Sequence, residues 1–324
     1  MSEAAPARSR PDPSLPRSSR ATPGLLLTAL FPAALWGINN VAIAVAARHL
    51  PVATFNASRS ALSVLCLLLW LQVQKGLAPA SLSRRTVGRG LLVGGVGLGI
   101  FQILLVLSIN VNGAAISAVL STLSQLIAVA YERRSAGGPP HARTGAAGAI
   151  GLREITGSLA ALAGVCVIFL PEITAVQGWN PLGLVYGLAA PVCWAIFTIG
   201  SRPLLAAAGP LLSTGLALAG ATLVLTPFSF IEWRAGLIPP LAGLPAGAWF
   251  AFAVSVAVGA VLSNVVWLRV LQAVGPARAL LATYMLPVVT MVLSVVLLGD
   301  AIDAYEAVGS LLVVLGVAWV RPPR

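Results

Sequence analysis

The sequence predicts an all-α integral membrane protein whose ten transmembrane helices form two five-helix repeats of inverted topology. Three observations predict this fold. The 324-residue chain is 58% hydrophobic and only 9% charged, whereas roughly a quarter of the residues in soluble domains are charged. Apolar runs of about 20 residues, the length that crosses a hydrocarbon core of ~30 Å, recur along the chain. A segment near the middle of the sequence also returns near its end.

The repeat pairs residues 154–165, EITGSLAALAGV, with residues 306–317, EAVGSLLVVLGV. Six residues are identical at a constant offset of 152, close to half of the chain. The shared Glu and Ser carry most of the weight, because Leu and Val match easily in so apolar a chain. A weaker echo relates Trp36 to Trp194. Self-similarity at a fixed period indicates a duplicated fold, and duplicated membrane bundles are typical of transporters.

Each apolar run is expected to cross the membrane as a helix, because backbone N–H and C=O groups find no water to bond inside lipid. The runs are continuous rather than alternating, which argues against a β-barrel. The fifth and tenth runs are short, and their assignment depends on the repeat. The predicted spans are 24–47, 52–72, 90–110, 113–131, 155–170, 182–201, 211–231, 246–267, 279–299 and 305–320.

These spans divide the chain into a first repeat over residues 24–172 and a second over residues 180–324. Residues 1–23 are rich in Pro, Ser and Arg and are predicted to form a disordered, basic cytoplasmic tail. A basic start before an apolar run also describes a signal peptide, but the length of the first span favours a retained helix. Residues 135–151 have the composition of a flexible, inserted loop.

The net charge of +11 maps to one side of the predicted bundle, which holds 17 of the 20 Lys and Arg residues. Positive residues mark the cytoplasmic face, so we expect a multi-pass protein of the cell (inner or plasma) membrane with both termini in the cytoplasm. The charge is then a topology signal, and nucleic-acid binding is not expected. Five spans per half, an odd number, invert the second repeat, and such transporters hold substrate near the midplane between repeats.

No pattern in the sequence indicates an enzyme or a cofactor site. The three cysteines lie inside predicted spans and are expected to pack as small apolar residues. The two histidines lie in loops without neighbouring ligands, so no metal is expected, and no HExxH, GxSxG or Walker motif occurs. GGVGLG at 94–99 imitates a phosphate-binding loop, but it lies inside an apolar span. Gly95 and Gly99 are expected to permit close helix packing instead.

Two stretches carry a diffuse motif pattern. Residues 267–320 combine an aromatic-led helix, GxAxA, LPVV, an acid after LLG and an E-x-x-G helix, and residues 35–62 combine Trp-Gly, a proline and an arginine in the second span. These features resemble the EamA family of the drug/metabolite transporter superfamily, and the resemblance covers all ten spans. The residues that carry it are Trp36, Gly37, Pro51, Arg59, Gly275, Ala277, Ala279, Pro287, Asp300 and Glu306.

The resemblance implies a basket of ten helices around a central cavity, and similar members export amino acids or other small metabolites. The first half departs from the family pattern at two points. Residues 123–125 read Leu-Ser-Gln, so the proline expected to kink the fourth span is absent. The acid that usually follows is Glu132, but the loop from it to Arg153 is longer than the usual short hairpin.

Polar residues inside spans usually face the interior of the bundle. The predicted substrate-binding residues are Trp36, Asn39, Asn40, Arg59, Gln102, Trp194, Asn264 and Tyr284. A wider set of polar candidates comprises Asn56, Asn110, Ser121, Thr122, Ser124, Gln125, Thr198, Trp267 and Thr283. Each has a structural alternative: Ser and Thr can bond their own helix, Asn and Gln can join helices, and the Trp pair can pack the core.

Arg59 lies about seven residues into the second span from its outer side. It could snorkel to the interface, or it could bind a substrate carboxylate through its planar fork. All nine Asp and Glu map to the tail, loops or span ends, so no acid in the membrane core is available to pair with it. The same lack disfavours an antiporter of lipophilic cations, which needs an embedded carboxylate, and favours a neutral or zwitterionic substrate.

The sequence therefore predicts a secondary transporter that exports amino acids or similar small metabolites by alternating access. Its expected partners are a small-molecule substrate and the lipid bilayer, and no oligomeric state is predicted. The alternatives are a non-transporting membrane receptor or scaffold, and a multidrug efflux protein. An intramembrane enzyme would need converging nucleophile, base or metal ligands, which the spans do not supply.

Overall fold

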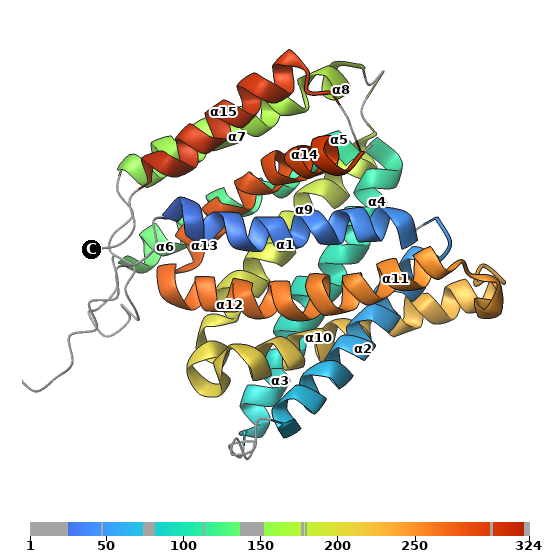
Figure 1. The fold of residues 1–324 in the computed structure, drawn as a ribbon. Helices are drawn as coiled ribbons and strands as arrows, with labels where there is room; N and C mark the ends of the chain where they lie inside the picture. Colours follow the sequence, from blue (N-terminus) through green and yellow to red (C-terminus); the bar gives the residue numbers. More distant parts are fainter. Residues whose placement is uncertain are drawn as a thin grey trace, which may run out of the picture.

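The computed structural model is a bundle of helices (Figure 1). No strand occurs in the part of the chain that it describes. The predicted tail, residues 1–23, and most of the predicted loop 135–151 lie outside that part. The described residues are 25–46, 48–73, 82–112, 114–136, 152–175, 178, 180–298 and 301–320.

The first half of the chain contains eight helical elements in the described residues. Its third long helix is continuous from α3 through a π-helical turn, η1, into α4. The elements are α1 (Leu25–Ala46), α2 (Val52–Val73), α3 (Arg84–Gly94), η1 (Gly95–Ile100), α4 (Phe101–Asn112), α5 (Ala114–Ser121), α6 (Leu123–Ala136) and α7 (Leu152–Ile168). A short helix, α8 (Leu170–Ala175), leads into the second half.

The second half has the same succession of elements, and its third long helix again contains a π-helical turn, η4. Two 3₁₀ turns, η3 (Leu241–Gly243) and η5 (Ala282–Tyr284), precede α11 and α14. The remaining elements are α9 (Pro181–Gly200), α10 (Arg202–Arg234), α11 (Ala246–Val254), η4 (Ser255–Leu262), α12 (Ser263–Val274), α13 (Pro276–Leu281), α14 (Met285–Leu298) and α15 (Ala304–Trp319).

Every predicted span overlaps one of these helices or a continuous run of them. Among the described residues, six runs are long and apolar enough to cross a membrane, which makes this an apolar helical protein of the membrane type. Three shorter apolar helices are Leu30–Ile43, Ile116–Glu132 and Ala304–Trp319. The six long runs are Val52–Val73, Arg84–Asn112, Pro181–Gly200, Arg202–Arg234, Ala246–Val274 and Pro276–Leu293. Ten crossings therefore remain a prediction.

Glycine and proline set the breaks in the second half. Gly209 has φ 68° inside the run called α10, and Pro210 restarts the helix after it. Gly275, with φ 82°, ends α12, and Pro276 begins α13. A left-handed residue ends a helix most easily when it is glycine, and proline fits the first helical position because it has no N–H to leave unbonded.

The fourth span of the first half breaks although it lacks the proline that the family pattern led us to expect. α5 ends at Ser121 and α6 begins at Leu123, with Thr122 between them. The Thr122 hydroxyl donates to the carbonyl of Val119 at 2.5 Å, and the Ser124 hydroxyl donates to that of Ser121 at 3.0 Å. Hydroxyls that bond nearby carbonyls compete with the helical pattern and coincide here with the break.

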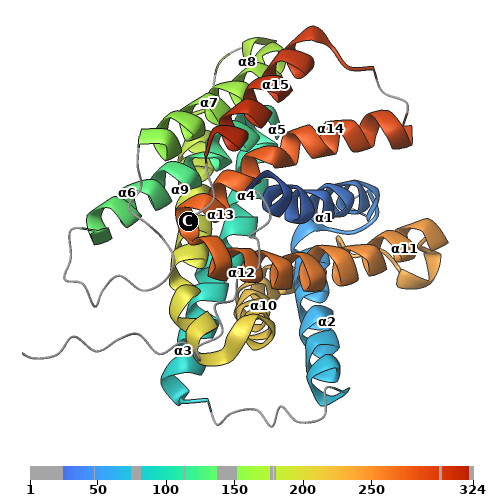
Figure 2. The same cartoon turned by 60° about the vertical axis from the view of Figure 1, so that its left-hand side comes forward.

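Glycines allow the helices to approach each other closely. The predicted packing through Gly95 and Gly99 is confirmed, because a Cβ at these positions would lie 3.0 and 2.9 Å from the Val224 side chain on α10. α7 and α15 lie side by side in both views (Figures 1 and 2). Gly164 and Gly309 meet in that seam, where a Cβ on either would lie 2.6 Å from the carbonyl oxygen of the other.

We expect Gly164→Val to lower stability by about 1–3 kcal/mol, because the added side chain meets rigid backbone of α15 rather than a side chain that can rotate away. Gly88→Val is the matched control, since a Cβ at that helical glycine would meet nothing within 4 Å. Thermal unfolding of both purified variants in detergent measures the difference. Equal midpoints for the two variants would show that the α7–α15 seam tolerates the added volume.

Candidate functional site

The polar part of the candidate site surrounds the guanidinium of Arg59 on α2, which is 9% exposed. One terminal nitrogen, Nη1, donates to Ser255 Oγ at 3.1 Å and to Asn39 Oδ1 at 3.4 Å. The other, Nη2, donates to Asn56 Oδ1 at 2.9 Å and to Gln102 Oε1 at 3.1 Å. These partners come from η4, α1, α2 and α4. Arg59 therefore points into the bundle, where residues of both halves meet, and does not snorkel to the outer interface.

All four partners of Arg59 are neutral. Its Nε has no hydrogen-bond partner among the described residues, and the Phe55 ring lies 5.4 Å from the guanidinium carbon. A largely buried ion pair, between Arg278 and Glu154, lies elsewhere in the bundle. Neutral oxygens satisfy the N–H groups of a guanidinium but leave its charge uncompensated, and a buried charge is expensive unless an opposite charge compensates it. The site is therefore suited to an anionic group.

The backbone of η4 brings Asn39 into this cluster. A Cβ at Gly259 would overlap the Asn39 side chain, so this glycine lets α1 lie directly against the π-helical turn. Ser255, the first residue of η4, donates to Asn39 Oδ1 at 2.9 Å. Ser255 was not predicted from the sequence, because a lone serine in an apolar span more often bonds its own helix. Single π-helical turns are frequent at functional sites.

Five aromatic rings lie beside the polar cluster. The centroids of Trp36, Trp194 and Trp267 are separated pairwise by 5.7, 5.2 and 5.8 Å. Phe101 and Phe197 add contacts of 5.2 and 5.3 Å with Trp194. The echo between the two tryptophans in the sequence thus corresponds to direct contact in space. Trp267 is fully buried, and its indole N–H has no partner in the described part of the chain.

The aromatic and polar clusters share two helices. Trp36 and Asn39 are three residues apart on α1, so they occupy one face of that helix. Phe101 and Gln102 are neighbours at the start of α4. A ligand bound to Arg59 would therefore lie close to the ring cluster, which supplies an apolar wall.

Three predicted site residues do not join these clusters. Asn40 is exposed. Asn264 donates to the carbonyl of Ala260 on its own helical run at 2.9 Å. Tyr284 is fully buried, and its hydroxyl donates to the carbonyl of Thr122 at 3.4 Å. The structure thus brings together five of the eight predicted positions, namely Trp36, Asn39, Arg59, Gln102 and Trp194.

A separate cavity of about 350 Å³ lies between α1, α14 and α15. Only aliphatic side chains and one methionine line it, so it offers no group that could orient a polar ligand. Its lining residues are Leu30, Met285, Val288, Val289, Val292, Leu293 and Val314. The described residues contain no group of three or more His, Cys, Asp or Glu that could hold a metal ion.

The fold and this site define an apolar, all-helical membrane bundle with a buried cation between its halves. Residues 181–321 match the sequence profile of the EamA-like transporter family. The second half of the chain is therefore a domain of the EamA-like transporter family.

Among known proteins similar to the chain are a transporter sequence and a solved structure. A stretch of 128 residues is 30% identical to "Uncharacterized transporter YyaM" of Bacillus subtilis (strain 168), and the match spans 39% of this chain and 40% of that protein. A protein of known crystal structure superposes with a TM-score of 0.70, over 91% of this chain and 95% of its own, at 18% identity. This second similarity shows a shared fold.

Proposed function

We propose that the protein is a secondary transporter that exports amino acids or similar small metabolites by alternating access. The observation that carries the proposal is the buried guanidinium of Arg59, held by neutral oxygens from both halves of the chain. The family of the second half and the name of the Bacillus subtilis relative support transport. We further propose ten transmembrane helices in two inverted repeats, 24–172 and 180–324.

The α7–α15 seam supports the inverted repeat. At the offset of 152, Gly157 corresponds to Gly309 and Gly164 to Gly316. In the seam, Gly157 lies against Gly316 and Gly164 lies against Gly309. The first glycine of α7 therefore faces the second glycine of α15, and the second glycine of α7 faces the first of α15. The two helices are antiparallel. An antiparallel pair of equivalent helices is expected where a two-fold axis in the membrane plane passes between repeats.

The two π-helical turns give independent support for the repeat. Gly97 in η1 lies against Phe197 on α9, and Gly259 in η4 lies against Asn39 on α1. Phe197 and Asn39 each follow a tryptophan by three residues, Trp194 and Trp36. The same contact therefore recurs in both halves, with an apolar side chain in one and a polar side chain in the other. The polar one of the two contacts is the one at η4, where Asn39 also accepts a hydrogen bond from Arg59.

A substrate carboxylate would replace some of the neutral oxygens around Arg59 and form charge-assisted hydrogen bonds, which are roughly twice as strong as neutral ones. Asn39 and Gln102 would then bond other polar groups of the substrate, and Trp36 and Trp194 would form the apolar wall. Asn40, Asn264 and Tyr284 remain predicted substrate contacts, although they lie outside the two clusters.

The alternative functions fit this site less well. An efflux protein for lipophilic cations needs a carboxylate in the membrane core, whereas the acids of this chain lie in the tail, loops or span ends, so organic cations are disfavoured. A passive receptor or scaffold gains nothing from a buried charge that lacks a counter-charge, since such a charge is expensive to hold. Transport measurements separate the scaffold from the transporter.

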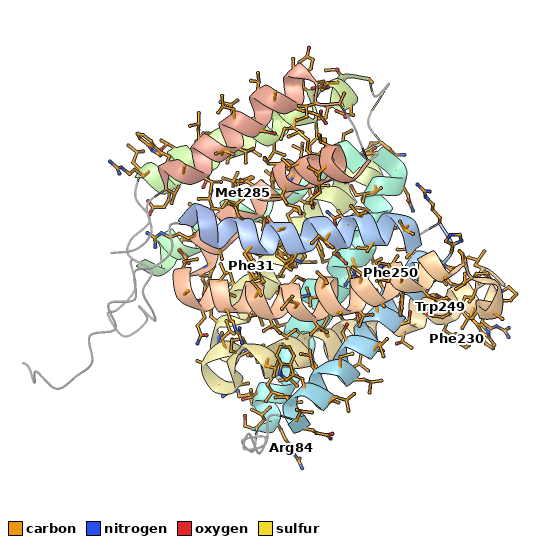
Figure 3. All side chains as sticks on the ribbon, viewed as in Figure 1. Phe31, Arg84, Phe230, Trp249, Phe250 and Met285 are labelled. Carbon is orange, nitrogen blue, oxygen red and sulfur yellow. The ribbon has the colours of Figure 1, made fainter. Side chains whose placement is uncertain are left out.

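The proposed orientation places both termini in the cytoplasm. Figure 3 shows Phe230, Trp249 and Phe250 together near the connection from α10 to α11, away from Arg84 at the start of α3. All three aromatic side chains are exposed. Arginines concentrate on the cytoplasmic side, which supports a cytoplasmic position for Arg84. The aromatic residues are suited to a membrane interface and lie away from Arg84, so they are compatible with the opposite face.

We expect a cysteine at Arg84 (Arg84→Cys) to react with a membrane-impermeant maleimide only from the cytoplasmic side. Intact cells and inside-out vesicles expose opposite faces and give the two measurements. Trp233→Cys, at the opposite end of the bundle, is the control and is expected to react in intact cells. Labelling of Arg84→Cys from the outside alone would contradict the proposed orientation.

Overexpression is expected to confer resistance to toxic amino-acid analogues and to accelerate efflux of radiolabelled amino acids from preloaded cells.

Arg59→Lys should lower the efflux rate about tenfold, because lysine keeps the charge but loses the bidentate fork, and Arg59→Ala should lower it further. Arg234→Ala removes an exposed arginine and is the control. Wild-type efflux by Arg59→Ala at equal expression would refute the role of Arg59, and no efflux of any substrate by the wild type would refute export itself.

A further inference from the structure

Carboxylates join the two halves of the bundle at both of its ends. At the end formed by the start of α2, the Glu232 carboxylate of α10 accepts hydrogen bonds from the backbone N–H groups of Ala53 at 2.9 Å and Thr54 at 2.7 Å. It also accepts one from the Thr54 hydroxyl at 2.7 Å. An acid of the second half therefore caps the N-terminus of a first-half helix. We call these contacts the outer tie.

The opposite end has a tie with the roles of the halves exchanged. Arg278 of α13 donates to Glu154 of α7 at 2.7 Å, and the two side chains are only 8% and 13% exposed. Glu132 of α6 accepts from the backbone N–H of Ala277 at the start of α13, at 3.4 Å. Here acids of the first half bind the N-terminal turn of a second-half helix. We call these contacts the inner tie.

The outer tie adjoins the apolar residues that lie between Arg59 and that end of the bundle. Phe55 directly follows Thr54, is 2% exposed, and lies 5.4 Å from the Arg59 guanidinium. Its ring packs on Phe252 with a centroid distance of 5.7 Å, and Ala42 is buried in the same cluster. Release of the first turn of α2 would therefore move the apolar residues that separate Arg59 from that end of the bundle.

We propose that the outer and inner ties are the two locks of the transport cycle, of which one opens while the other stays closed. The inference rests on the proposed function. Hydrogen bonds to a charged group contribute enough to hold an end closed, yet water can replace them once the end opens. The two conformations of such a protein differ by only a few kcal/mol, so loss of a single tie should shift the population toward opening at that end.

Two buried alanines serve as reporters of opening. Ala42 on α1 lies under the outer tie, and Ala128 on α6, which is 0% exposed, lies one turn before Glu132 of the inner tie. Each is changed to cysteine in full-length protein whose native cysteines, Cys66, Cys166 and Cys193, are replaced by serine or alanine. The rate of reaction with a charged, membrane-impermeant methanethiosulfonate is measured from each side without substrate.

Glu232→Gln is expected to raise the labelling rate of Ala42→Cys about tenfold from the outside, a change equivalent to about 1.4 kcal/mol. It should leave Ala128→Cys unlabelled. Glu154→Gln and Arg278→Ala should have the reverse effect, with faster labelling of Ala128→Cys from the cytoplasmic side. The control is Glu306→Gln, because the Glu306 carboxylate accepts from the Asp303 N–H just before its own helix, a bond that lies entirely within the second half.

The proposal is overturned if the variants accelerate both reporters equally, which would mean general loosening, or if neither reporter changes. The reporters require no substrate, so they distinguish this inference from the proposed function. If each variant accelerates labelling of only one reporter but the protein exports no amino acid, the two locks stand and the proposed substrate is wrong. If the protein exports amino acids but neither labelling rate changes, the proposed function stands and the locks are wrong.

Discussion

The arrangement of the bundle centres on one buried charge. The guanidinium of Arg59 lies among oxygens of Asn39, Asn56, Gln102 and Ser255, so α1, α2, α4 and η4 must all converge on it. Arginine stays protonated in proteins, and none of these partners carries an opposite charge. The bundle is therefore folded around a cation that only neutral oxygens contact among the described residues, which is the basis for proposing an anionic ligand.

Glycines, which have no side chain, make this convergence possible. The π-helical turns η1 and η4 place glycines where α9 and α1 cross them, and Gly259 in particular leaves room for the Asn39 side chain. Apolar helices in lipid gain little from the hydrophobic effect between them, so small residues and interhelical hydrogen bonds dominate their association. In this chain, glycines allow close packing between helices. Carboxylates such as Glu232 and Glu154 join the two halves at the ends of the bundle.

The sequence predicted where the helices lie, because apolar length can be read directly. It also singled out Arg59, Trp36 and Trp194, and the structure places these side chains in contacts inside the bundle, while their role in binding stays a prediction. It did not predict which way each helix faces. α1 is apolar on all sides, so its pattern could not distinguish buried Asn39 from exposed Asn40. Ser255 and the break at Thr122 were missed because a π-helical turn and hydroxyl–backbone bonds leave no periodic signal. The partnership of Glu154 with Arg278 depends on tertiary contact between residues far apart in the sequence, which no pattern in the sequence indicates.

If Arg59 recognises a carboxylate, two ligands that differ in this group should bind the protein with different affinities. The dissociation constants of an amino acid and of its carboxamide are measured on purified wild-type protein and on Arg59→Met. A hydrogen bond to a charged group is worth about 1.5–3 kcal/mol, so the wild type should bind the acid at least about tenfold more tightly than the amide. Arg59→Met should bind both equally. A preference for the acid that survives in Arg59→Met would show that a group other than Arg59 recognises the carboxylate.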